Sequence, residues 1–128
     1  MANPNIVNVT NILGNTSTNL ISSTADPFAT ALVNNAASSG KVYKINSIVV
    51  ANVDGSAAAD ITISIFSQDD LGGTGTAIAS TISVPADATL IVTDKTTSFY
   101  LLEDKSIGAT ASAANELVVT CSWEEINQ

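Results

Sequence analysis

The sequence contains no histidine, no arginine and only one cysteine among its 128 residues. Without histidine, Ser-His-Asp and Cys-His catalysis are excluded, and so are metal sites built on imidazole. A single cysteine, Cys121, can form neither an intramolecular disulfide nor a structural zinc site. It lies in an alternating apolar run close to Glu124 and Glu125, which indicates a buried small side chain and not an activated thiol.

Charged residues are also scarce, at 12% of the chain, and the net charge is −8. The four lysines are scattered, so no basic cluster is available to bind a nucleic acid or an anionic membrane surface. No run approaches the roughly 18 apolar residues of a membrane span, and no secretory signal is visible. The polar residues are mostly Ser, Thr and Asn, a composition that suits close contact with other protein surfaces and also suits a plain secreted β-domain.

The acidic residues offer few sites for chemistry. Glu103-Asp104 and Glu124-Glu125 are adjacent pairs, and neighbours in a strand point to opposite faces, so neither pair is a ready acid–base couple for a glycosidase. The segment DDLGGTG lacks the ending of a phosphate-binding loop and the alternating oxygen ligands of a calcium loop. A flexible hairpin tip is the favoured interpretation. We therefore expect no enzyme activity, no metal and no cofactor.

Alternation of apolar and polar residues with a period of two dominates the chain. In ELVVTCSWEEI, every second residue from Leu117 to Trp123 falls on one face, which is typical of a strand that lies against a core. In KVYKINSIVVANV, residues 41–53, the alternation is broken by Ile48 and Val50. The residues that keep it are Tyr43, Ile45, Val49 and Val53. Apolar residues on both faces indicate a central strand, or one whose outer face is covered by another chain.

Further strand candidates follow at short intervals, separated by turn signals such as NNAASSG, VDGS, VPADAT and SAAN. They span roughly residues 5–13, 17–23, 29–34, 60–67, 76–84, 88–93, 98–102 and 105–111. This pattern predicts an all-β fold, a single antiparallel β-sandwich domain over residues 1–128 with about eight strands, either jelly-roll or immunoglobulin-like. Residues 1–24 form either its first strands or an N-terminal arm that adds to a neighbour's sheet edge.

Four segments also occur in an informative order. They are the turn Asn52-Val53-Asp54-Gly55, the corner Val84-Pro85-Ala86-Asp87, the run Tyr100-Leu101-Leu102-Glu103 and the terminal Glu124-Glu125-Ile126. In this order they resemble a family of small virion structural proteins of tailed phages, particularly phages of marine cyanobacteria. The similarity covers roughly residues 30–126. Asp104-Lys105 departs from it, because such proteins often carry Gly-Asp there, and this affects only the local turn.

The resemblance implies a non-enzymatic β-sandwich protein that is present in many copies in a virion and assembles in the host cytoplasm. We expect a decoration or accessory protein on the capsid, neck or tail, which contacts itself as a homo-oligomer, a trimer being one option, and contacts major capsid or tail proteins. The predicted docking residues are Asn5, Ile6 and Val7, together with the strand around Ile48 and Val50.

The alternative function is binding to the host surface, as an adhesin or carbohydrate-binding module at a tail or fibre. It predicts exposed aromatic side chains, or a calcium ion, in loops such as 68–76. The sequence has no aromatic residue in that loop, so the virion structural role is favoured.

Overall fold

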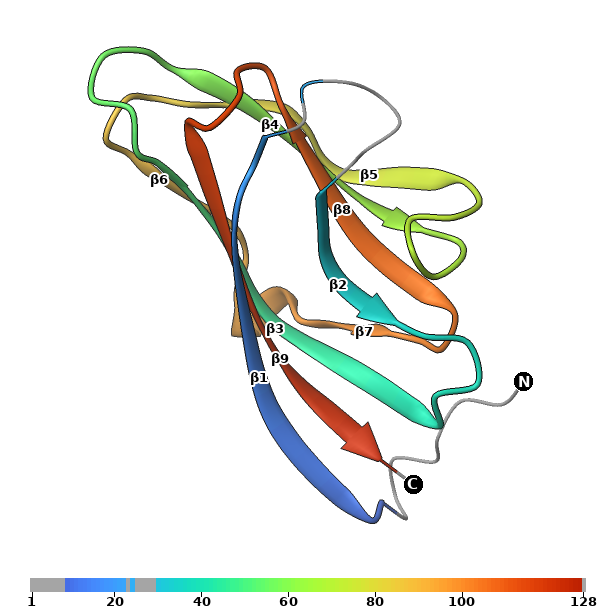
Figure 1. The fold of residues 1–128 in the computed structure, drawn as a ribbon. Coiled ribbons are helices and arrows are strands. Elements are labelled where there is room, and N and C mark those ends of the chain that lie inside the picture. The colour runs from blue at the N-terminus through green and yellow to red at the C-terminus, as the bar shows by residue number, and fades with distance from the viewer. Residues whose placement is uncertain (1–8, 23, 25–29, 128) are drawn as a thin grey trace.

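The chain folds as two antiparallel β-sheets packed face to face (Figure 1). The structure is a computed structural model that describes residues 9–22, 24 and 30–127. The strands within these residues are β1 (Asn11–Leu20), β2 (Thr30–Asn35), β3 (Lys41–Asn52), β4 (Ala59–Phe66), β5 (Gly75–Val84), β6 (Thr89–Thr93), β7 (Phe99–Leu101), β8 (Lys105–Ala111) and β9 (Leu117–Asn127), with a short 3-10 turn, η1 (Lys95–Thr97), between β6 and β7. No helix in this part of the chain is long and apolar enough to cross a membrane. The predicted antiparallel β-sandwich is confirmed.

The order of the strands identifies the sandwich as a jelly roll. One sheet has the order β1-β9-β3-β6, with β7 also beside β3, and the other has the order β2-β8-β4-β5. β6 and β7 pair with successive parts of β3, so they act as one strand interrupted by η1. Counted in this way, the first strand pairs with the last, the second with the seventh, the third with the sixth and the fourth with the fifth, which is the jelly-roll arrangement.

The core lies between the sheets and is built mainly from β-branched and aliphatic side chains. Fully buried members include Ile45, Ile48, Val50, Ile61, Ile63, Ile107, Leu117 and Val119. Burying one such side chain contributes about 1.5–3 kcal/mol. The alternation in β9 is confirmed, because Leu117, Val119, Cys121 and Trp123 all belong to this core.

A β-bulge in β3 changes which of its residues face the core. The register of β3 with β9 shifts just after Ile45, so the inward residues beyond the bulge are Ile48 and Val50. The predicted continuation of the alternation to Val49 and Val53 is therefore wrong, and Val53 is 58% exposed. The central position of the strand, between β9 and β6, is confirmed.

The first described strand is longer than the sequence predicts. Two pieces were expected, at 5–13 and 17–23, but β1 continues through Gly14 to Leu20, with every residue paired to β9. The expected break falls at Gly14 and Asn15, because Gly and Asn are depleted in strands. At a sheet edge these residues are tolerated, because little core packing is required of them. Residues 5–8 of the predicted strand lie outside the described residues.

The loop between β4 and β5 is the predicted hairpin tip, because these two strands pair antiparallel on either side of it. It was expected to be flexible, but it is hydrogen-bonded to neighbouring segments. The backbone N–H of Leu71 donates to Ser106 Oγ at 2.9 Å, and that hydroxyl donates to the carbonyl of Gln68 at 2.8 Å. Asp70 exchanges two hydrogen bonds with Asn34 of β2, at 2.7 and 2.9 Å. The DDLGGTG segment is therefore a fixed part of the sandwich surface.

Candidate interaction surface

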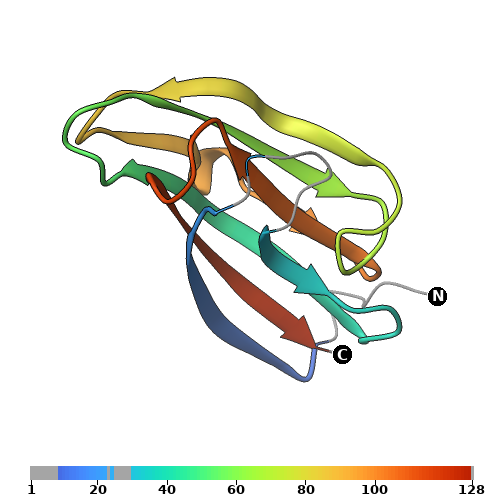
Figure 2. The same cartoon turned by 45° about the horizontal axis from the view of Figure 1, so that its top comes forward.

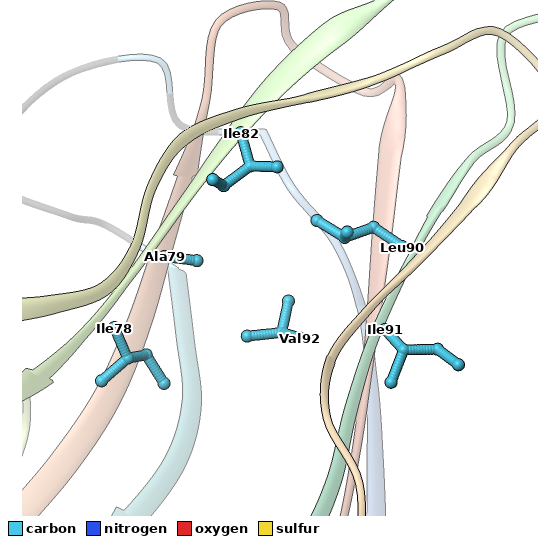
Figure 3. Close-up of a pocket in the computed structure, with 6 residues that line it drawn as sticks. All are labelled: Ile78, Ala79, Ile82, Leu90, Ile91 and Val92. Carbon is cyan, nitrogen blue, oxygen red and sulfur yellow. The ribbon is translucent and has the colours of Figure 1, made fainter. Parts of the chain in front are cut away.

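A narrow apolar groove lies between β5 and β6, the edge strands of the two sheets. It is lined by Ile78, Ala79 and Ile82 of β5 and by Leu90, Ile91 and Val92 of β6, and its volume is about 180 Å³. Figure 3 shows Ile82 and Leu90 facing each other across the groove, while Ile91 points away from it on the far side of β6. Ile78, Ile82 and Ile91 are 40, 41 and 62% exposed.

The shape of β5 follows from two irregularities in its pairing with β4. The register shifts twice between Ile61 and Ser64, so β5 carries extra residues. At the first shift, Thr81 has a φ of +50°, a left-handed conformation that is unusual for a β-branched residue. Its N–H donates to Thr62 Oγ1 at 3.0 Å instead of joining the regular ladder. Because bulges bend a strand and blunt its edge against further pairing, β5 presents side chains to a partner more readily than backbone.

The size and lining of the groove indicate what it can bind. Its volume of about 180 Å³ is below the roughly 300–1,000 Å³ of typical small-molecule pockets. All six lining residues have apolar side chains, so no polar side chain lines the groove to orient a substrate. One or two apolar side chains of a protein partner fit these properties.

The apolar surface continues from the groove over the outer face of the five-stranded sheet. Ile91 pairs with Val49 of β3, which pairs in turn with Thr120 of β9. One step along the sheet, Val118 pairs with Leu20 of β1, which is 49% exposed. This part of the face carries only aliphatic and hydroxyl side chains. Contiguous apolar patches of a few hundred Å² are often functional in monomeric proteins.

The docking residues predicted from the sequence fall into two groups. Asn5, Ile6 and Val7 lie outside the described residues. Ile48 and Val50 are 0% exposed and belong to the core, whereas Val49, between them, points outward. A docking surface on β3 would therefore present Val49, and the participation of this strand in docking stays a prediction.

A polar cluster lies at the opposite end of the same sheet, around the buried carboxylate of Glu125. Lys41 Nζ contacts it at 3.3 Å, and the side-chain amide of Asn15 donates a hydrogen bond to it. Burial, and then the charge and hydrogen bond of Glu125, raise the pKa of Tyr43 to about 12. The Tyr43 ring stacks on Trp123 with 6.1 Å between ring centroids. Because the carboxylate is well partnered, this cluster is best explained as structural.

The thiol of Cys121 and the carboxylate of Asp69, which lie outside these surfaces, have structural roles and do not form a reactive site. Cys121 is 0% exposed, and burial raises the pKa of its thiol to about 12, so the expectation of a buried small side chain is confirmed. Asp69 accepts a hydrogen bond from the N–H of Ala37 at 2.9 Å. Across residues 9–22, 24 and 30–127, no group of three or more His, Cys, Asp or Glu side chains could hold a metal ion.

Comparison with known proteins gives limited information. No protein-family model matches the chain, and no curated protein matches it. One solved structure that resembles it is a chain of the T13 IBDV viral particle, with a TM-score of 0.46 and 9% identity over 94% of this chain. This chain spans about a third, 32%, of that chain's length. A likeness of this degree carries no information on function.

The groove was not predicted from the sequence, although the strands that form it were. The segments 76–84 and 88–93 were recognised, but their isoleucines alternate with Ser and Thr as in any amphipathic strand. Only the strand order places both segments at sheet edges, next to each other. The absence of charge from both segments is the one sequence signal that could have indicated the groove.

Proposed function

We propose that this protein is a non-enzymatic structural component of a phage particle, a decoration or accessory protein on the capsid, neck or tail. The observation that carries the proposal is the charge-free apolar surface formed by the groove and the adjoining sheet face. The resemblance of the sequence to virion proteins of marine cyanobacterial phages supports the same role. Jelly rolls are frequent in viral capsids, and this supports the proposal only by analogy of fold.

In this role, the protein docks by placing apolar side chains of a neighbouring virion protein in the groove. Removing apolar surface from water contributes roughly 25 cal/mol per Å². The exposed Ile78 and Ile82 supply much of that surface in the groove, and Ile91 supplies it on the adjoining sheet face (Figure 3). None of the six residues that line the groove is charged, although Asp87 lies in the loop that joins β5 to β6. Contact that is confined to the lining side chains therefore buries no charged group of the lining.

The test uses purified particles of the phage that encodes this sequence. Mass spectrometry of gradient-purified particles should find the protein at many copies per particle. Recombinant protein should then co-sediment with particles that lack it. Absence of the protein from purified particles would overturn the proposal.

Two variants test whether the groove, at Ile82, and the adjoining sheet face, at Ile91, form the contact. Ile82→Asp and Ile91→Asp each place a charge on the apolar surface and should weaken co-sedimentation at least tenfold. Ala57→Asp adds the same charge in the exposed loop between β3 and β4 and should bind as the unmodified protein does. Thermal melting of all three variants shows whether they are folded. Equal binding by the groove variants and the control would place the contact elsewhere.

A further inference from the structure

We propose that β1 joins two copies of this chain, by pairing antiparallel with β1 of a second copy about a twofold axis. The two five-stranded sheets would then form one continuous sheet across the dimer. This inference rests on the homo-oligomeric part of the proposed function and assigns that part to a specific strand. It is separate from the groove, which lies along the opposite edge of the molecule (Figure 2).

β1 is a regular sheet edge with no protection against pairing. Its residues Asn11–Leu20 pair with β9 without a register shift, and within the described residues no strand pairs with its other side. The sequence NILGNTSTNL contains no charged residue and no proline. Natural proteins usually guard long edge strands with charge, proline or bulges. An unguarded edge of this length is expected where another strand covers it.

The side chains of β1 are also more apolar than a solvent-exposed edge requires. Ile12, Leu13 and Leu20 are 54, 51 and 49% exposed. Ile12 and Leu20 lie near the two ends of the strand and on the same, outer face of the sheet, because they are an even number of residues apart. A partner strand must therefore offer an apolar side chain near each of its own ends.

β1 itself meets this requirement when it is reversed. The residues on its outer face are Ile12, Gly14, Thr16, Thr18 and Leu20. A twofold axis at Thr16 places Ile12 opposite Leu20 of the second copy, and Thr16 opposite Thr16. Cross-strand pairs of apolar residues and of threonines stabilise a sheet. A twofold contact needs a self-complementary surface of this kind.

The charges of the two copies do not oppose this contact. The charged side chain next to β1 on the outer face is Glu124, which is in register with Gly14 and stands opposite Lys44 on β3. In the dimer, three strand spacings of roughly 4.8 Å separate the two Glu124 side chains laterally. This separation of about 14 Å exceeds the screening length of about 8 Å at physiological salt.

The length of the strand sets the expected strength of the dimer. Ten residues extend for roughly 33 Å. A contact that is only one strand wide belongs with the small interfaces, below the roughly 1,600 Å² of a standard one. We therefore expect a dimer that dissociates on dilution.

Charge substitutions at the axis test both the strand and its register. In light scattering, the unmodified protein should approach twice its 13.0 kDa mass as its concentration rises. Thr16→Lys and Thr16→Glu should each remain at 13.0 kDa, because like charges would face each other across the axis. An equimolar mixture of the two variants should recover the doubled mass. Thr120→Lys, which places the same charge on β9, should dimerise as the unmodified protein does.

Three outcomes would overturn the inference, and they bear differently on the proposed function. An unmodified protein that stays at 13.0 kDa refutes the dimer, while particle binding can still support docking. A doubled mass that Thr16→Lys does not change places the self-contact elsewhere and leaves the homo-oligomer intact. A stable trimer excludes the twofold pairing. Recovery in the mixture cannot be explained by misfolding of the single variants.

Discussion

Replacing Gly108 with alanine tests how the loop between β4 and β5 is seated on the four-stranded sheet. A Cβ atom at this position would lie 2.7 Å from Cδ2 of Leu71, in that loop, and 3.1 Å from Cε1 of Phe66. Carbon atoms in favourable contact are about 3.5–4.0 Å apart. The end of the Leu71 side chain must therefore shift to admit one methyl group, and the backbone carbonyl oxygen of Thr30, 3.3 Å from the new Cβ, limits how far the methyl group can move the other way.

The expected change in the free energy of unfolding results from two opposing effects. Gly108 does not have a positive φ, so alanine fits its backbone and would by itself stabilise the strand by roughly 0.5–1 kcal/mol. Overpacking of a filled site typically costs about 1–3 kcal/mol. We expect Gly108→Ala to lower the free energy of unfolding by about 1–2 kcal/mol, which corresponds to a decrease in Tm of roughly 3–8 °C in a domain of this size.

A double-mutant cycle isolates the contact responsible. Leu71→Ala removes the Cδ2 atom, so Gly108→Ala should cost about 1 kcal/mol less in that background. The matched control is Gly14→Ala in β1, whose Cβ would meet nothing within 4 Å and which should not destabilise the protein. Urea unfolding followed by circular dichroism measures all of these values. If Gly108→Ala costs the same with and without Leu71, the account of the loop's seating is wrong.

Three further predictions concern ionisable groups. The Cys121 thiol should resist alkylation at pH 8 until the chain unfolds; rapid labelling of folded protein would contradict its burial. The pKa of Tyr43 is about 12 when folded and near 10 when unfolded, so the unfolded chain loses this proton first. The free energy of unfolding should therefore fall as the pH rises from about 10 to 12, and it should fall less steeply in the Tyr43→Phe variant. Equal pH dependence in the two proteins would refute this prediction. Lys41→Met should lower the free energy of unfolding by about 1–2 kcal/mol, because the Glu125 carboxylate loses its ion pair. The same substitution should cost less in a protein that already carries Glu125→Gln.

The fold class could be predicted because alternation survives in most strands. The inward residues of β9, from Leu117 to Trp123, are those that the pattern indicates. In β4 the predicted alternation Ile61, Ile63, Ile65 holds for the first two residues, but beyond them Ser64 is buried and Ile65 is only partly buried. The pattern failed in β3, where the bulge after Ile45 inserts one residue and reverses the facing of everything that follows. A bulge has no fixed sequence marker, and in the segment KINSIVV either set of alternate residues could face the core.

The candidate surface was harder to predict, because it depends on which strands are edges. The alternation of apolar and polar residues shows which side chains of a strand face the core. It does not show which other strands lie beside that strand in the sheet. Ile82 and Ile91 become a shared apolar surface only because the jelly-roll order places β5 and β6 at adjacent edges. Ile48 and Val50 were favoured as docking residues because they broke the alternation. The same break results from the bulge, which turns both side chains into the core.

The two long edge strands are constructed differently, and this indicates different partners. β5 is bulged, with Thr81 at a φ of +50°, so its backbone is a poor template for another strand but its isoleucines remain accessible. β1 is regular and uncharged, so its backbone is a good template. A partner's side chains suit the first edge, and a second copy's strand suits the second. Ile82→Asp should therefore impair binding to particles and leave dimerisation intact, and Thr16→Lys should do the reverse. Loss of both properties in either variant would show that the two edges form one interface.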